Sequence, residues 1–128
     1  MPQVIAYLTH LASGIALLAA FFFIYVKFTP YDEPQLIRKG NRAAARSLCG
    51  ALIGFSLTLA SSLLHNDALP VFLAWAAGGM VVQLGVYVLI AHTIARVDQA
   101  IIDDNEAMGT LLGGISVAVG IINAACMS

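Results

Sequence analysis

Four long apolar stretches limit what this chain can fold into. They cover about residues 4–28, 47–64, 69–95 and 107–127 of the 128-residue chain. A bilayer core of about 30 Å is spanned by about 20 apolar residues, because an α-helix rises 1.5 Å per residue. We therefore predict an all-α, polytopic membrane protein with four transmembrane helices in a single domain, residues 1–128.

The composition agrees with a membrane protein and excludes other classes. Hydrophobic residues make up 60% of the chain and charged residues 10%, against roughly 45–50% and 25% in soluble domains. A net charge of −1 provides no basic surface for nucleic acid. Two cysteines are too few for a disulfide-rich scaffold.

The connections between the stretches predict two helical hairpins. Residues 65–68 form a short turn, whereas residues 27–46 and 96–106 form longer polar segments. The two polar segments must lie on the same side of the membrane. Neither is long enough to fold as a soluble domain, which argues against an extramembrane enzyme.

The basic residues predict the orientation. All six occur in the two polar segments: Lys27, Arg38, Lys39, Arg42, Arg46 and Arg96. The positive-inside rule makes that side cytoplasmic. Both termini are then expected outside, which is the periplasm in a bacterial inner membrane.

The two halves of the chain, residues 1–64 and 65–128, resemble each other. At an offset of 64 residues, positions 35–60 and 99–124 share seven identities, including Asn41 with Asn105. Each half would hold two spans, so the sequence predicts a parallel repeat of two hairpins about an axis along the membrane normal.

Aligned positions at the polar ends of the two halves carry opposite charges. Lys39 aligns with Asp103, and Arg42 aligns with Glu106. One interpretation is that these groups pair across the repeat axis. The alternative is two solvated loops whose charges do not meet.

The first polar segment contains a predicted helix that starts near Glu33-Pro34 and continues into the second span, with a weak point at Gly40-Asn41. Arg38, Arg42 and Arg46 would then form one basic stripe, with Lys39 beside it. This stripe predicts docking of a cytoplasmic partner or an anionic lipid. The alternative is ordinary topology anchoring.

Small residues at helix-packing spacing occur in the second and fourth spans. Such residues let helix backbones approach closely in a membrane. We expect these two helices to pack together or against another copy in a homo-oligomer. The candidate packing residues are Gly50, Gly54, Gly109, Gly113, Gly114 and Gly120.

Two polar residues, Gln83 and Asn123, fall within the third and fourth spans. We expect each to hydrogen-bond to another helix. No charged residue falls deep in a span, which argues against an ion-coupled transporter. An oligomeric pore lined by small and polar residues stays open as an alternative.

No residue pattern indicates catalysis, a metal site or a cofactor. The three histidines fall near opposite membrane faces, and a His10–His65 pair is a minor alternative. Cys49 and Cys126 are expected near opposite faces too, beyond the roughly 7 Å that a disulfide allows between Cα atoms.

The chain resembles the YjfL-type family of small bacterial inner-membrane proteins. The resemblance follows residues 24–37, then Phe72-Leu73-Ala74-Trp75, then Val82-Gln83-Leu84, and finally residues 123–127. It implies four spans built from a duplicated two-helix unit, with no established activity. It also implies a link to a phage-shock-type peripheral membrane protein and to envelope stress.

Together these observations predict a non-enzymatic, oligomeric anchor in the inner membrane that recruits a cytoplasmic peripheral membrane protein. The alternative prediction is a small homo-oligomeric channel or transporter.

Overall fold

The computed structural model describes residues 2–66 and 68–127, and no described residue lies in a strand. The predicted all-α fold is thus confirmed. The described helices are α1 (Pro2–Phe28), α2 (Glu33–Arg38), α3 (Arg42–His65), α4 (Leu69–Thr93), α5 (Val97–Ile102) and α6 (Glu106–Cys126).

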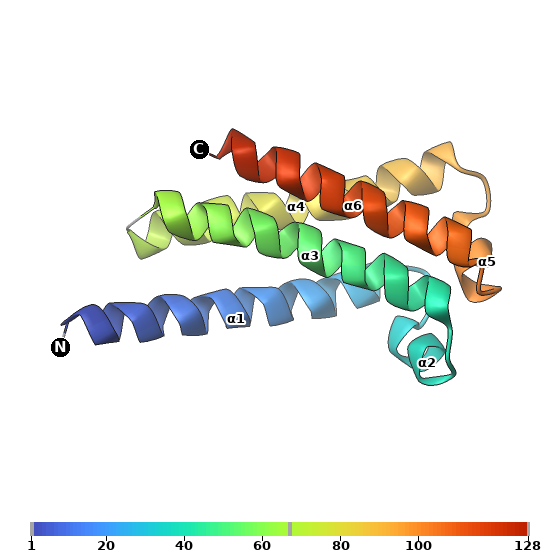
Figure 1. Ribbon diagram of the computed structural model, residues 1–128, viewed down its shortest axis with the longest axis horizontal. Coiled ribbons are helices and arrows are strands. Elements are labelled where there is room, and N and C mark those ends of the chain that lie inside the picture. Colours follow the sequence, from blue (N-terminus) through green and yellow to red (C-terminus); the bar gives the residue numbers. More distant parts are fainter. Residues whose placement is uncertain (1, 67, 128) are drawn as a thin grey trace.

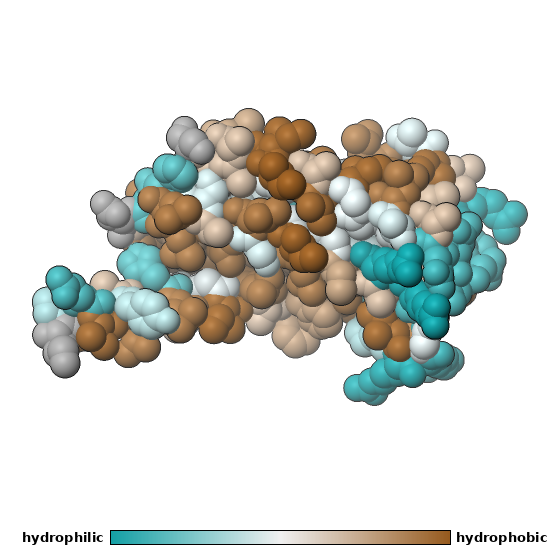
Figure 2. All heavy atoms as spheres, in the orientation of Figure 1, coloured by the Kyte–Doolittle hydropathy of each residue, from teal (hydrophilic) through white to brown (hydrophobic). Residues whose placement is uncertain are grey.

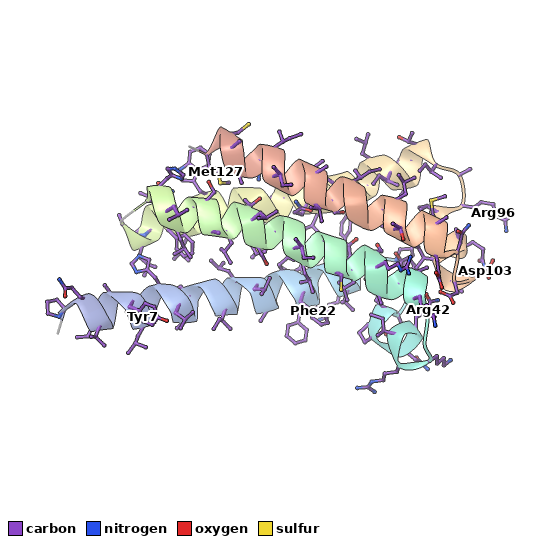
Figure 3. All side chains as sticks on the ribbon, viewed as in Figure 1. Tyr7, Phe22, Arg42, Arg96, Asp103 and Met127 are labelled. Carbon is purple, nitrogen blue, oxygen red and sulfur yellow. The ribbon has the colours of Figure 1, made fainter. Side chains whose placement is uncertain are left out.

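Four of these helices, α1, α3, α4 and α6, are long and apolar enough to cross a membrane. The short helices α2 and α5 lie at one end of the bundle, whereas the chain termini and the α3–α4 turn lie at the other (Figure 1). Hydrophilic residues gather at the α2–α5 end, and an apolar band covers the middle (Figure 2). Arg42, Arg96 and Asp103 lie at the α2–α5 end, and Tyr7 and Met127 lie toward the other (Figure 3).

The expected continuous helix from Glu33 into the second span is wrong. Helix α2 ends at Arg38, and α3 begins at Arg42. Gly40 between them has a φ of 89°, a left-handed conformation that only glycine adopts without cost. Asn41 then starts α3 anew, because its side chain accepts a hydrogen bond from Ala44 N at 2.8 Å.

Helix α3 is the centre of the bundle, between α1 and α6, with α4 behind it (Figure 1). Its small residues face α6, and its Phe55 faces α1, where the ring stacks on Phe21 at 4.7 Å. Helix α1 buries only Gly14, Phe21 and Tyr25. Its N-terminal half therefore remains a largely exposed apolar surface.

Candidate functional site at the α2–α5 end

The turns that precede α3 and α6 have the same construction, 64 residues apart. Asn41 N donates to Leu36 O at 2.9 Å, and Asn105 N donates to Ala100 O at 2.9 Å. The residue before each asparagine has a positive φ, 89° at Gly40 and 60° at Asp104. Helices α2 and α5 have the same length and also begin 64 positions apart (Glu33 and Val97).

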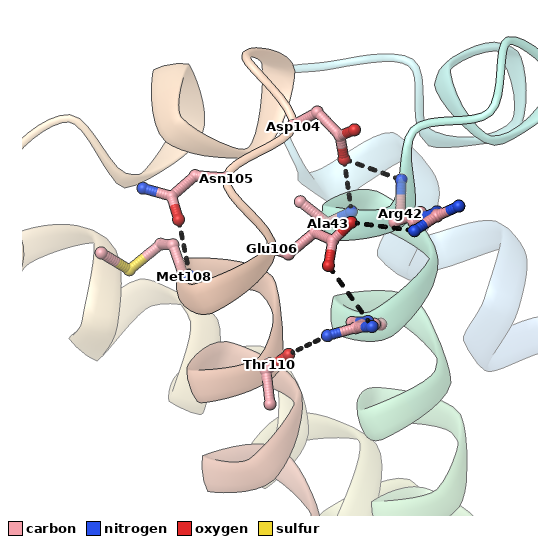
Figure 4. A network of polar contacts seen from close by, with 8 residues as sticks. Arg42, Ala43, Asp104, Asn105, Glu106, Met108 and Thr110 are labelled. Carbon is pink, nitrogen blue, oxygen red and sulfur yellow. Dashed lines mark hydrogen bonds and ion pairs between the residues drawn. The ribbon is translucent and has the colours of Figure 1, made fainter.

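The two turns are joined by hydrogen bonds between the halves. Asn41 Nδ2 donates to Ile101 O at 2.8 Å. In return, Asp104 Oδ1 accepts from Arg42 N at 2.8 Å and from Ala43 N at 3.0 Å. The first free N–H groups of α3 are thus capped by a carboxylate from the other half of the chain (Figure 4), a favourable position for a negative charge.

The opposite charges of the two segments meet at Glu106. Its carboxylate lies 3.4 Å from Arg42 Nη1 and 3.5 Å from Arg46 Nη2, and Arg46 Nη1 also donates to Thr110 at 2.9 Å. The interpretation of two unconnected loops is therefore wrong. These pairs are partly exposed, so each contributes about 0–1 kcal/mol. The expected pairing of Lys39 with Asp103 is wrong too, because no ion pair joins them among the described residues, and Asp103 accepts from Gln99 instead.

The predicted basic stripe is divided in two. Arg42 and Arg46 lie about one helical turn apart on α3, and each forms an ion pair with Glu106. Arg38 is the last residue of α2, and Lys39 directly follows it. The break at Gly40 removes the continuous helix on which the stripe depended. Arg38 and Lys39 are exposed, and neither has a carboxylate within 4.0 Å among the described residues.

A shallow groove runs between α2 and the end of α5. It is lined by Tyr31, Leu36, Lys39 and Ile102 among others. Asp32 and Lys39 line both this groove and a second hollow beside α2, which Arg38 lines as well. The free cations of α2 thus adjoin a partly apolar surface.

A buried carboxyl lies beneath this surface. Glu33, the first residue of α2, has 0% exposure. Its Oε1 accepts a hydrogen bond from Thr29 Oγ1 at 2.8 Å, but its Oε2 has no partner among the described residues. Burial raises the pKa of Glu33 to about 7, and the hydrogen bond from Thr29 acts in the opposite direction.

Three hydroxyl groups are buried without a partner in the described part of the chain, as the Glu33 Oε2 atom is. They belong to Tyr25, Tyr31 and Ser47. Burial, and then the charge of Glu33, raise the pKa of the Tyr31 phenol far above its usual range. The group at this end therefore combines one carboxyl with neutral hydroxyls.

The sequence interpretation missed Glu33, because an acidic residue before a proline was taken only as a helix start. A signal was available: Glu33, Leu36 and Ile37 recur at the spacing of one helical face. Since Leu36 and Ile37 pack against the core, the same face carries Glu33 into the protein.

Helices α3 and α6 pack together, as the small residues predicted. A Cβ added at Gly50 would collide with the backbone of Gly113, and one added at Gly109 would collide with Ala43. Gly54 and Gly120 are in the same kind of contact. The helix backbones thus touch along most of their length.

Gly114 is the exception among the predicted packing residues. It is exposed, and a Cβ added there would meet nothing within 4 Å among the described residues. The reason is geometric, because one residue along a helix turns the side chain by about 100° away from the contact that Gly113 makes.

The polar residues of the third and fourth spans are used inside the chain. Gln83 is 1% exposed, and its Nε2 donates to Ser116 O at 3.3 Å. Asn123 Nδ2 donates to Thr58 Oγ1 at 3.4 Å. Both bonds join neighbouring helices, as expected for amides in a membrane.

The comparisons with known proteins agree with the resemblance noted from the sequence. Residues 1–127 match the family described as Domain of Unknown Function (DUF350). The chain is 34% identical over 128 residues to UPF0719 inner membrane protein YjfL of Escherichia coli (strain K12), covering all of this chain and 97% of that protein.

A second relative comes from another bacterium. The chain is 28% identical over 114 residues to UPF0719 transmembrane protein YshE of Bacillus subtilis (strain 168), covering 88% of this chain and 85% of that protein. No solved structure matches the chain significantly.

Proposed function

This chain belongs to the DUF350 family, and from that premise we propose that it is a non-enzymatic inner-membrane anchor whose α2 end recruits a cytoplasmic peripheral protein. The chain is a multi-pass inner-membrane protein, given its four apolar helices and the names of its relatives. The role in envelope stress implied by the family resemblance belongs to this proposal.

The proposed orientation has α2 and α5 in the cytoplasm and both termini in the periplasm. Its support is the distribution of basic residues, all six of which lie in residues 27–46 or at Arg96. These residues belong to the end of the bundle that carries the short helices, and basic residues favour the cytoplasmic side.

We also propose that the chain arose by duplication of a two-helix unit. The support is the matched construction of the two halves, in which α2–α3 and α5–α6 begin at positions 64 residues apart. The left-handed residues at 40 and 104 fit the same relationship.

The observation that carries the docking proposal is the pair of free cations on α2. Arg42 and Arg46 share the single carboxylate of Glu106, so part of their combined charge is balanced within the chain. Arg38 and Lys39 are exposed beside a partly apolar groove. The complementary partner is a protein with an acidic surface that carries an apolar side chain for the groove.

A homo-oligomer is part of the proposal. Its support is the exposed Gly114 on α6, because small residues let helix backbones approach closely in a membrane. Gly114 borders a groove between α3 and α6 that Gly50, Ile53 and Val117 also line, where a helix of another copy could approach closely.

The alternative, a small homo-oligomeric channel or transporter, has less support. Gln83, the proposed polar lining, is buried and bonded to Ser116. The backbone contact of Gly50 with Gly113 leaves no space between α3 and α6 at that level.

The test is crosslinking in intact membranes, followed by purification and mass spectrometry of the captured proteins. Two variants of equal charge are compared, Arg38→Gln with Lys39→Gln, and Arg42→Gln with Arg46→Gln. We expect the first pair to lose a cytoplasmic partner and the second pair to retain it. Equal capture by both variants and by the unmodified chain would contradict the docking proposal.

A further inference from the structure

We propose that Glu33 is a proton-binding site that controls the position of α2: the protonated carboxyl keeps α2 docked on the bundle, and loss of the proton releases it. The inference concerns α2 itself. Only for its consequence at Arg38 and Lys39, which α2 carries, does it rest on the proposed function.

The first support is the solvation of the carboxyl. Glu33 is fully buried, and Thr29 provides the hydrogen bond it receives from the described residues. The start of α2 gives it little help, because Pro34 has no N–H and Gln35 N donates to Asp32 Oδ1 at 3.3 Å. A buried carboxylate with one hydrogen bond is strongly disfavoured relative to the neutral acid.

The second support is the set of groups that face the carboxyl from each neighbouring element. These are Tyr25 on α1, Tyr31 in the α1–α2 connection and Tyr87 on α4, with Ser47 of α3 beside Tyr25 and Asp98 of α5 acting on Tyr87. The side chains that interact with Glu33 in the described part of the chain carry hydroxyls: Thr29, Tyr25, Tyr31 and Tyr87. Among the described residues, no lysine or arginine lies within 4.0 Å of Glu33 to stabilise its charge.

These neighbours favour protonation of the Glu33 carboxyl. The neutral carboxyl carries no charge and gains an O–H donor, so the unpartnered Oε2 atom no longer holds a buried negative charge without a hydrogen bond. A proton needs no cavity, and Glu33 and Tyr25 are packed to 0% and 1% exposure. A single carboxylate among hydroxyls would hold a metal cation weakly.

The third support is that α2 is a short element separated by a turn from α3. It has six residues, too few for a helix that is stable by itself, so its position depends on packing through Leu36 and Ile37. The turn at Gly40, with its φ of 89°, separates it from α3. A change of charge at Glu33 therefore acts on a small, separately hinged element.

The direction of the pH response follows from the pKa values of the Glu33 carboxyl in the docked and in the released state of α2. Burial raises the pKa of docked Glu33 to about 7 from an ordinary value of 4.5. The docked state therefore binds more protons between these values, and docking weakens as the pH rises through that interval. Acidification on the side of the membrane that α2 faces docks α2.

The experiment uses the purified full-length protein in nanodiscs, without any partner, so its outcome is separate from that of the docking test. Hydrogen exchange measures the protection of the α2 amides from pH 4.5 to 8, corrected for the intrinsic exchange rate. We expect protection to fall by at least about tenfold over this interval, while the interior of α3 stays protected.

Two variants separate Glu33 from its neighbour. Glu33→Gln, which mimics the neutral acid, is expected to remove the pH dependence and keep α2 protected. Asp32→Asn, which changes the exposed adjacent carboxylate, is expected to keep the pH dependence. A pH dependence that survives Glu33→Gln, or that is lost in Asp32→Asn, would overturn the proposal.

A direct titration of the Glu33 carboxyl tests the proposal even if Glu33→Gln does not fold. The chain has two glutamates, Glu33 and Glu106, so ¹³C labelling of glutamate carboxyls gives two signals, and Glu106→Gln identifies the one from Glu33. We expect that signal to titrate together with the α2 protection. A carboxyl that is already ionised at pH 5, or a response that requires sodium ions, would refute the proton site.

Discussion

Asn41 and Ile101 join the two halves of the chain through a hydrogen bond of 2.8 Å between the Asn41 side chain and the Ile101 carbonyl. The same asparagine caps α3 through Ala44 N. Its counterpart Asn105 caps α6 through Met108 N at 3.2 Å but is exposed. Asn105 therefore only caps its own helix, whereas Asn41 caps α3 and also bonds to the other half of the chain.

The substitution Asn41→Ala is expected to destabilise the protein more than Asn105→Ala. Loss of a cap costs about 1 kcal/mol, and loss of the second hydrogen bond, to an Ile101 carbonyl that still accepts from Asp104 N, adds roughly 0.5–1.5 kcal/mol. Asn105→Ala should cost only the cap. Unfolding in nanodiscs by steric trapping measures both, and equal losses would argue against the bond between the halves.

The adjacent glycines of α6 are expected to respond in opposite ways to the same substitution. A Cβ at Gly113 would collide with Arg46 O, whereas one at Gly114 meets nothing within 4 Å among the described residues. Gly113→Ala should therefore cost roughly 1–3 kcal/mol. Gly114→Ala should stabilise the monomer by up to about 1 kcal/mol, since alanine favours a helix.

The measurement is the free energy of unfolding of both variants under conditions that keep the protein monomeric. A cost at Gly114 that appears only at high protein density would locate the contact between copies at that residue. Equal effects at the two positions would contradict the close approach of α3 and α6.

The sequence was sufficient to predict the four spans because their length and apolar character depend on the bilayer alone. It also identified Gly50 and Gly113, because backbone contact in a membrane requires small residues at regular spacing. These features are local, so the residue pattern along one helix is enough to predict them.

The remaining features depend on how distant segments meet. That Asp104 caps α3, sixty-two residues away from Arg42, follows from the packing of α5 against the start of α3. The burial of Glu33 likewise depends on α2 folding back on the bundle after the break at Gly40. The sequence predicted Arg38 and Arg42 on one helix, because no proline separates them. A glycine such as Gly40, which can adopt a left-handed conformation, is a weaker signal that a helix ends.

Two acidic residues at the junction are expected to contribute unequally. Asp104 Oδ1 accepts from two backbone N–H groups of α3, whereas Glu106 makes partly exposed ion pairs. Asp104→Asn should cost about 1 kcal/mol, since bonds to a charged acceptor are stronger. Glu106→Gln should cost less than about 1 kcal/mol.

Unfolding at low and high salt separates the two contributions. The loss in Glu106→Gln should shrink further as salt screens the exposed pairs, while the loss in Asp104→Asn should persist. A larger effect at Glu106 than at Asp104 would show that the ion pairs, and not the cap, hold the halves together.

Gln83→Leu is expected to leave the protein folded and close to its original stability. Gln83 Oε1 is buried without a partner among the described residues, so an apolar side chain of similar size removes an unsatisfied atom together with one 3.3 Å hydrogen bond. In a pore lined by this residue, the same change would alter ion flux through proteoliposomes. A folded Gln83→Leu variant with changed flux would favour the channel.

The stability of the whole protein is expected to depend on pH through Glu33. Its folded pKa of about 7 is raised above the ordinary 4.5, so the folded state binds more protons than the unfolded state between these values. The stabilising effect of the proton is complete below about pH 4.5 and is lost as the pH rises toward 7. At about 1.4 kcal/mol per pKa unit, the difference corresponds to roughly 3 kcal/mol.

Unfolding free energies at pH 5 and pH 8 measure this dependence, and Glu33→Gln provides the reference. The other carboxylates are present in both proteins, so the difference between the two pH profiles isolates Glu33. The unmodified chain should lose stability relative to Glu33→Gln as the pH rises. Parallel profiles would mean that the carboxyl is ionised without penalty, and that its burial does not couple the proton to the fold.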